Sequence, residues 1–297
     1  MAAVIVPWRD RHGRLLPLKA VVLFAGFIPG TVLAFWLATG VLGARPVTEA
    51  IHGAGDWAIR FLMIALAITP AARVLDWPRI LLVRRIVGLT ALAYAVAHFS
   101  LCIVDQNLNL LVVASEIVRR FYLTIGFVTL LGLGVLGATS TDGWMHRLGR
   151  RWKRLHRAIY GLGVVALLHY FIQSKSNVSE PVFMTGLFVW LMLWRALPMG
   201  WQRSLAAQLA LTMVAAFAAV GIEFGWYGLT TGINPWRVLA ANETLSYGLR
   251  PAHYVALVGL AVVVLSALRR IKRPVWPHTI GARRAAVPEL DPGKQSL

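Results

Sequence analysis

The sequence predicts an all-α membrane protein, a polytopic helix bundle of about eight transmembrane helices with both termini in the cytoplasm. Hydrophobic residues make up 58% of the 297 residues, charged residues only 14%, and the mean hydropathy is +0.66. A soluble domain of this length could not cover so much apolar surface. The formal net charge of +18 is spread over short basic runs between apolar segments. This pattern is typical of cytoplasmic loops and argues against nucleic acid as a partner.

Eight apolar segments are long enough to cross a hydrocarbon core of about 30 Å at about 1.5 Å per residue. Most Lys and Arg residues flank these segments on one side, so the positive-inside rule places that side in the cytoplasm. We expect the first segment to be a span, because it is longer than the apolar region of a signal peptide. The predicted spans are residues 18–42, 57–75, 86–104, 121–139, 157–173, 182–197, 205–229 and 251–268.

The connecting loops are too short for a folded soluble domain, which excludes a built-in Rossmann or flavodoxin-like module. The single cysteine, Cys102, excludes an internal disulfide and any multi-cysteine metal or iron–sulfur site. We divide the chain into a cytoplasmic N-terminal segment (1–17), a six-helix core (18–197), two additional transmembrane helices (198–271) and a disordered cytoplasmic tail rich in proline and charge (272–297).

Two histidines lie inside apolar runs, His98 in AVAHFSLCIV and His169 in VVALLHYFIQ. An ionisable side chain within the bilayer needs a partner that offsets its desolvation. Each lies 12 residues past the inner border of its span, at Ile86 and Arg157, which is a depth of about 18 Å. Two imidazoles at one depth predict the ligation of one b-type haem between the third and fifth spans. The alternative is that each packs as a polar residue and donates a hydrogen bond to a backbone carbonyl.

The type of haem follows from what the sequence lacks. There is no C-x-x-C-H motif, so covalent c-type attachment is excluded. Six-coordinate iron leaves no open position for oxygen, and it therefore suits electron transfer better than oxygen chemistry.

A third histidine, His156, lies at the inner mouth of the fifth span in RRWKRLHRAIY. It could ligate a second haem, bind a flavin or quinone headgroup, or be an interfacial residue. Arg84 and Arg85 occupy the matching position of the third span. They could pair with haem propionates or a flavin phosphate, or they could only follow the positive-inside rule. We expect electrons to enter near His156, Arg84 and Trp152.

Other polar residues carry weaker signals. His52 and His253 near outer borders, and His146 in an inner loop, are expected to be solvated. Glu223 lies in the seventh span, where it could handle protons or hold its carboxylate in interfacial water. A cofactor-free, proton-coupled transporter that uses the intramembrane histidines and this glutamate is the alternative function. The glycines of LGLGVLG (131–137) lie inside a span, where they indicate close helix packing and not a nucleotide site.

Three segments carry a family resemblance: RRIVGLTALAYAVAH (84–98), YLTIG near Tyr122, and LGRRWKRLHRAIYGLGVVALLHYFIQSK (148–175). They resemble the MsrQ family, the haem-binding membrane subunit of the bacterial periplasmic methionine sulfoxide reductase system, within the ferric-reductase-like transmembrane superfamily. The resemblance covers about residues 15–197 and implies that 18–197 is a ferric-reductase-like haem-binding core. It implies that His98 and His169 are the haem ligands and that His156 is the inner histidine.

The resemblance also implies a function. One haem b, or two if His156 ligates another, and FMN would carry electrons from the quinone pool or a cytoplasmic flavin reductase. The acceptor would be a periplasmic molybdopterin-containing methionine sulfoxide reductase, which repairs oxidised periplasmic proteins. The chain would then be a non-catalytic electron-transfer subunit in the bacterial inner membrane. Larger members of the superfamily carry paired histidines on the third helix, whereas this chain has only His98 there.

Overall fold

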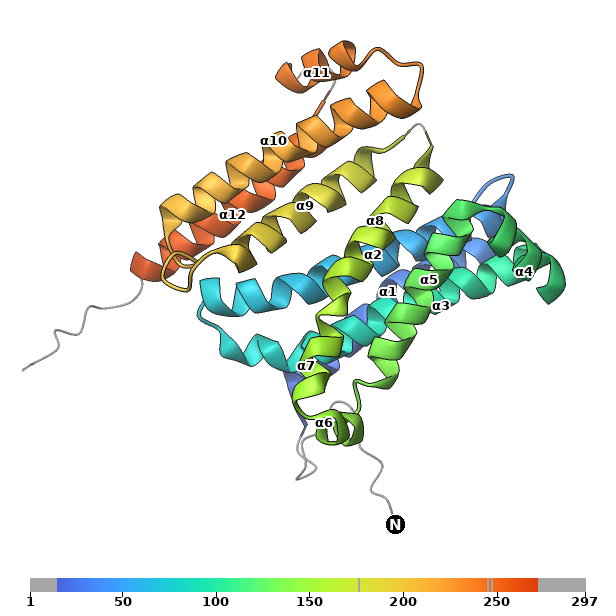
Figure 1. Cartoon of the computed structure of the whole chain (residues 1–297), viewed down its shortest axis with the longest axis horizontal. Helices are drawn as coiled ribbons and strands as arrows, with labels where there is room; N and C mark the ends of the chain where they lie inside the picture. The colour runs from blue at the N-terminus through green and yellow to red at the C-terminus, as the bar shows by residue number, and fades with distance from the viewer. Residues whose placement is uncertain (1–14, 176, 245, 247, 272–297) are drawn as a thin grey trace, which may run out of the picture.

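The computed structural model describes residues 15–271 except 176, 245 and 247. Within this part of the chain the structure is a bundle of helices without strands, which confirms the all-α prediction (Figure 1). The helices are α1 (Pro17–Ala38), α2 (Pro46–Val74), α3 (Arg84–Asp105) after the 3-10 turn η1 (Pro78–Val83), α4 (Leu110–Arg119), α5 (Phe121–Ala138), α6 (Asp142–Leu148), α7 (Arg150–His156), α8 (Ala158–Ser174), α9 (Ser179–Ala196), α10 (Leu205–Thr230), α11 (Pro235–Glu243) and α12 (Pro251–Ile271).

Seven helical stretches among the described residues are long and apolar enough to cross a membrane. They contain α1, α2, α3, α5, α8, α10 and α12. The sixth predicted span, 182–197, also forms a helix, α9, but it does not reach this level of hydrophobicity. Helix α9 packs against α2, α8, α10 and α12 and lies between them in Figure 1. Because protein surrounds it on several sides, its sequence need not provide a broad apolar face for lipid.

Helix α2 begins at Pro46, well before residue 57, where the second apolar span was predicted to start. Proline is favourable in the first turn of a helix, where its missing N–H would have no partner. The residues after it include Glu49, His52 and Asp56, which hydropathy assigns to a loop. The structure places all three on the helix and among the residues that line a cavity. Polar residues that face a cavity therefore extend the helix beyond its apolar part.

One end of the bundle, which we call the basic end, collects the loops that were predicted to lie together. Arg85 pairs with Asp142 at 2.8 Å, and Arg203 pairs with Asp76 at 3.6 Å. Arg270 donates a hydrogen bond to the carbonyl of Arg203. These contacts join the ends of α2 and α12, the starts of α3 and α6, and the α9–α10 turn. The alternation of the spans is thus confirmed, while the side of the membrane that the basic end faces stays a prediction.

The segments 1–14 and 272–297, with the predicted disordered tail, lie outside the described residues.

A contact with Tyr94 shows how the first helix is held on the bundle. Pro29 lies inside α1 and lacks the N–H of a regular turn. The hydroxyl of Tyr94, on α3, is inserted into the ladder beside it: it accepts from the N–H of Gly30 at 2.5 Å and donates to the carbonyl of Gly26 at 2.9 Å. A side chain that enters the backbone ladder is a recognised cause of helix kinks.

The glycine run in α5 is also explained by packing. A side chain at Gly132 would collide with Leu162 of α8, and one at Gly137 would collide with Leu92 of α3. These two glycines therefore let α5 approach both neighbours closely, as the sequence indicated.

A cavity lined by paired histidines

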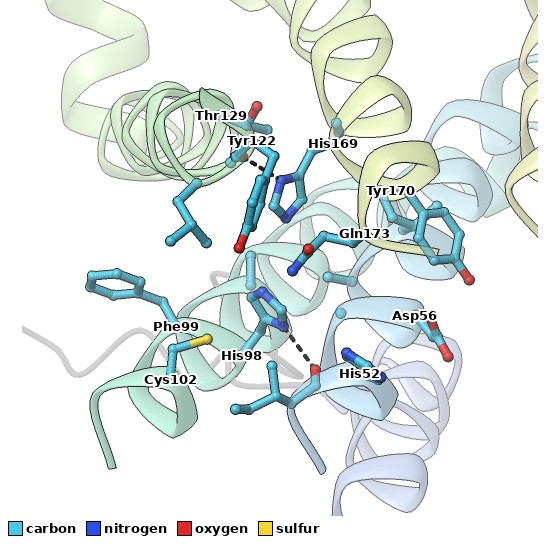
Figure 2. A pocket seen from close by; sticks show the side chains of 18 of the residues that line it. His52, Asp56, His98, Phe99, Cys102, Tyr122, Thr129, His169, Tyr170 and Gln173 are labelled. Atoms are coloured by element: carbon cyan, nitrogen blue, oxygen red, sulfur yellow. Dashed lines mark hydrogen bonds between the residues drawn. The ribbon is translucent and has the colours of Figure 1, made fainter. Parts of the chain in front are cut away.

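A cavity of about 930 Å³ lies among α2, α3, α5 and α8, with α4 and the start of α9 at its mouth. His98 of α3 and His169 of α8 both line it. Figure 2 shows the two rings pointing toward each other across the space between these helices. The apolar part of the wall includes Leu62, Phe99, Leu130, Leu133 and Ala166. The structure thus brings together the two intramembrane histidines that were predicted to act as a pair.

The spacing of the two imidazoles suits one metal ion between them. Their ring centroids lie 6.4 Å apart, and the ring planes are nearly perpendicular, at 83°. Two metal–nitrogen bonds of about 2 Å, with about 1 Å from each nitrogen to its ring centre, would place the ring centres about 6 Å apart across one metal. The observed separation is therefore compatible with one metal ion bound by both histidines.

Backbone carbonyls orient both rings. Nδ1 of His98 lies 2.8 Å from the carbonyl oxygen of Ile51, and Nδ1 of His169 lies 2.8 Å from that of Tyr122 (dashed in Figure 2). A carbonyl only accepts hydrogen bonds, so each Nδ1 carries the proton and each Nε2 keeps a free lone pair. The hydrogen bond expected of a polar packing residue is therefore present, and it leaves the other nitrogen available as a ligand.

The donor set also indicates the kind of metal. No group of three or more His, Cys, Asp or Glu side chains suited to a metal ion occurs among the described residues. Protein zinc sites use three or four such ligands, so two imidazoles alone would not complete one. A planar macrocycle that brings four equatorial nitrogens needs only two axial ligands from the protein. The residues present therefore fit a haem.

The mouth of the cavity is polar, at the end of the bundle opposite the basic end. Asp56 of α2 and Tyr170 of α8 both line this mouth. Arg60 of α2 and Glu180 of α9 form a bidentate ion pair, with hydrogen bonds of 2.6 and 2.8 Å. Carboxylates outnumber cationic side chains at this rim, while the apolar wall could hold the body of a flat cofactor. Polar or charged lining residues here are Thr48, Glu49, His52, Asp56, Asp105, Gln106, Glu116, Arg120, Gln173, Ser174, Asn177, Ser179 and Glu180.

Some of these residues were missed from the sequence. His52 was expected only to be solvated; it is exposed, but it also lines the cavity. Asp56 and Arg60 follow it at intervals of four residues, a spacing that places all three near one face of a helix. This signal was hidden because the segment was taken as a loop.

His156 and Trp152 lie together at the basic end of the bundle. Their rings stack at 3.9 Å, and the indole N–H of Trp152 donates to the carbonyl of Thr139 at 2.8 Å. Both ring nitrogens of His156 are within hydrogen-bond distance of protein atoms, the carbonyl of Trp152 at 3.2 Å and the hydroxyl of Ser140 at 3.3 Å. Neither aromatic residue lines the cavity of the paired histidines.

The two arginines at the start of α3 are also separate from that cavity. Arg84 and Arg85 are both exposed, and neither is a lining residue. Arg85 is engaged by Asp142. They therefore take no part in the lining of that cavity, and a role for them in cofactor binding stays a prediction.

The carboxylate of Glu223 is buried, so the alternative that it lies in interfacial water is wrong. Its side chain is 1% exposed and forms an ion pair with Arg250 at the start of α12. Its other oxygen accepts from the amide of Asn242 in α11 at 2.9 Å. Both oxygens are thus used to join α10 to α11 and α12.

The fold and the site define a multi-pass helical membrane protein with a cavity lined by paired histidines. Residues 54–167 match the family described as "Ferric reductase like transmembrane component". The chain is also similar to curated proteins named "Protein-methionine-sulfoxide reductase heme-binding subunit MsrQ". That of Caulobacter vibrioides is 38% identical over 177 residues, 59% of this chain and 84% of that protein. This chain belongs to the MsrQ family.

Two further relatives with this name agree. The protein of Brucella anthropi is 40% identical over 197 residues, which is 66% of this chain and 89% of that protein. The protein of Xanthomonas campestris pv. campestris is 41% identical over 163 residues, 54% and 73% of the two chains. No solved structure matches the chain. About a third or more of this chain thus lies outside each of these alignments, although most of each relative is covered.

Proposed function

We propose that this protein is a membrane electron-transfer subunit that holds one b-type haem between His98 and His169. The observation that carries the proposal is the pair of facing imidazoles, 6.4 Å apart, in a cavity of about 930 Å³. Membership of a family whose curated members are named haem-binding subunits supports it. The bound haem would supply one-electron chemistry, while the chain supplies ligands, depth and surroundings.

The chain's own residues would fix the iron environment. The carbonyls of Ile51 and Tyr122 hold the two imidazoles in the tautomer that ligates through Nε2. The apolar wall would keep water away from the body of a bound haem. If both histidines bind the iron, the site would favour electron transfer over binding of an external ligand.

The acceptor and donor belong to the same proposal. We propose that electrons leave at the end near the cavity for a periplasmic, molybdopterin-containing methionine sulfoxide reductase, and that the membrane is the bacterial inner membrane. The relatives' name, a subunit of protein-methionine-sulfoxide reductase, supports the acceptor. Electrons would come from the quinone pool or a cytoplasmic flavin reductase and enter at the basic end. FMN near His156, Trp152 and Arg84 is supported by the stacked aromatic rings and the positive charge there.

Absorption spectra of the purified protein test the haem. Dithionite reduction should sharpen the α and β bands of a low-spin b-type haem. His98→Ala and His169→Ala should each abolish that spectrum. His146→Ala, an exposed histidine of α6, is the matched control and should leave it unchanged. His52→Ala tests whether His52, which also lines the cavity, is needed for the spectrum.

Three outcomes would contradict the proposal. A colourless wild-type protein that moves protons or solutes in liposomes would favour the transporter alternative. Normal spectra in both single variants would reject the ligand assignment. Loss of the spectrum in His52→Ala alone would transfer the role to that residue.

A further inference from the structure

His98 of α3 is held by a backbone carbonyl and a glycine of the adjacent helix α2. Its Nδ1–H donates to the carbonyl of Ile51 in α2, which precedes it by 47 residues. The residue four positions after that carbonyl is Gly55. A Cβ atom on Gly55 would lie 3.0 Å from Nδ1 of His98 and 3.3 Å from its Cε1. The imidazole therefore rests against the bare backbone of α2.

His169 of α8 is held in the same way, by a backbone carbonyl and a glycine of α5. Its Nδ1–H donates to the carbonyl of Tyr122 in α5, which again precedes it by 47 residues. Four positions after that carbonyl stands Gly126. A Cβ atom there would lie 2.6, 2.8 and 3.0 Å from Cε1, Nδ1 and Nε2 of His169. Figure 2 shows the two dashed hydrogen bonds on opposite sides of the cavity, one for each histidine.

Helix geometry explains why the glycine follows each carbonyl by four residues. In an α-helix a carbonyl already accepts the N–H of the residue four positions on, which leaves one lone pair for another donor. The Cα–Cβ bond of that later residue tilts toward the helix N-terminus, so its side chain covers the carbonyl. Only a residue without Cβ leaves room for an imidazole to lie there. The same solution therefore occurs on α2 and on α5.

We propose that Gly55 and Gly126 are positioning residues for the two ligands. By leaving the carbonyls of α2 and α5 open, they fix the tautomer of each histidine and the near-perpendicular ring planes. This inference rests on the proposed haem function and adds the residues that set the redox properties of the iron. Hydrogen bonding from Nδ1 makes an imidazole a stronger donor to the metal and so lowers the reduction potential.

The two sites should differ in sensitivity. A methyl group at Gly126 would meet three ring atoms of His169 at 3.0 Å or less, so the ring must tilt or move. At Gly55 the nearest ring atom of His98 is 3.0 Å away and the next 3.3 Å, so a small shift relieves the contact. Gly126→Ala should therefore have a larger effect on its histidine than Gly55→Ala.

Two glycines on the same or adjacent helices provide matched controls. Gly134 of α5 and Gly88 of α3 have no atom within 4 Å of a built Cβ. Alanine at either position changes helix propensity by the same amount as in the test variants but touches no histidine. Protein yield and a single symmetrical size-exclusion peak in detergent check that each variant folds.

The experiment compares haem content, midpoint potential and low-temperature EPR in the four variants and the wild type. Gly126→Ala should weaken haem affinity by about 10-fold or more, as loss of a ligand's supporting hydrogen bond usually does. Gly55→Ala should retain haem with a more positive potential and a shifted low-field EPR signal. Gly134→Ala and Gly88→Ala should match the wild type.

The outcomes separate this inference from the function on which it rests. A wild-type protein without haem would reject the proposed function itself. A wild-type low-spin spectrum, with test variants identical to the controls, would reject only the role of the glycines. If Gly126→Ala fails to fold, the milder Gly55→Ala still decides: an unchanged potential and EPR signal there would overturn the inference.

Discussion

The buried ion pair of the last helices gives a sharp stability prediction. Glu223 of α10 is 1% exposed and binds Arg250 with one oxygen and Asn242 with the other. Glu223→Ala would remove both interactions at once. Two neighbouring atoms, Oδ1 of Asn242 and Nε of Arg250, are already buried without a hydrogen-bond partner. The substitution would thus leave a guanidinium without its counter-charge in a site with few alternative acceptors.

The magnitude follows from the burial of the partner. Breaking a fully buried pair costs about 3–5 kcal/mol, because one charge stays uncompensated. The side chain of Arg250 is 24% exposed, so it can reach some water, and we expect the lower part of that range. Glu223→Gln keeps an acceptor for Asn242 and removes only the charge, so it should cost about 1–3 kcal/mol.

Thermal unfolding in detergent, followed by intrinsic tryptophan fluorescence, measures these effects. Glu223→Ala should lower Tm by several degrees, Glu223→Gln by less, and the control Glu243→Ala, an exposed residue at the end of α11, not at all. Adding Arg250→Ala to Glu223→Ala should restore part of the loss, since the unpaired charge is removed. A Tm for Glu223→Ala equal to that of Glu243→Ala would refute the reasoning.

Three further expectations concern the first helix, the cavity mouth and the iron. Tyr94→Phe removes the hydroxyl that bonds to Gly30 and Gly26 of α1, and it should lower stability by about 1–3 kcal/mol in the same unfolding assay. Tyr254→Phe, at an exposed tyrosine, should not lower stability, and equal Tm values for the two variants would contradict the expectation. Arg60→Ala breaks the ion pair with Glu180; the two side chains are 31% and 32% exposed, so the loss should cost no more than about 1 kcal/mol. The haem spectrum should stay intact, and its loss would show that Arg60 has a direct role in binding. The 83° angle between the ligand planes predicts a strongly anisotropic low-spin EPR signal in the oxidised wild type, and the rhombic signal typical of parallel imidazoles would contradict it.

The positions of most long helices and the histidine pair could be predicted because both depend on spacing along single helices. Apolar length and basic borders located α3 and α8 closely, and equal depth then paired His98 with His169. Hydropathy could not extend α2 to Pro46, because polar residues that face a cavity resemble a loop.

Contacts between distant segments could not be predicted from periodicity. The partner of Glu223 is Arg250, 27 residues further along the chain, and a single sequence gives no sign that the two meet. The carbonyl partners of the histidines are 47 residues away for the same reason. Gly126 was part of a segment used for the family resemblance, yet only the packing of α5 on α8 shows what its missing side chain makes possible.

Haem content per chain tests the central claim most directly. A pyridine haemochrome assay on the wild type and on the His98→Ala, His169→Ala double variant counts b-type haem whether or not a second site exists elsewhere. The paired-ligand account predicts one haem fewer per chain in the double variant, with protein yield and oligomeric profile unchanged. Equal haem content in the two proteins would contradict it.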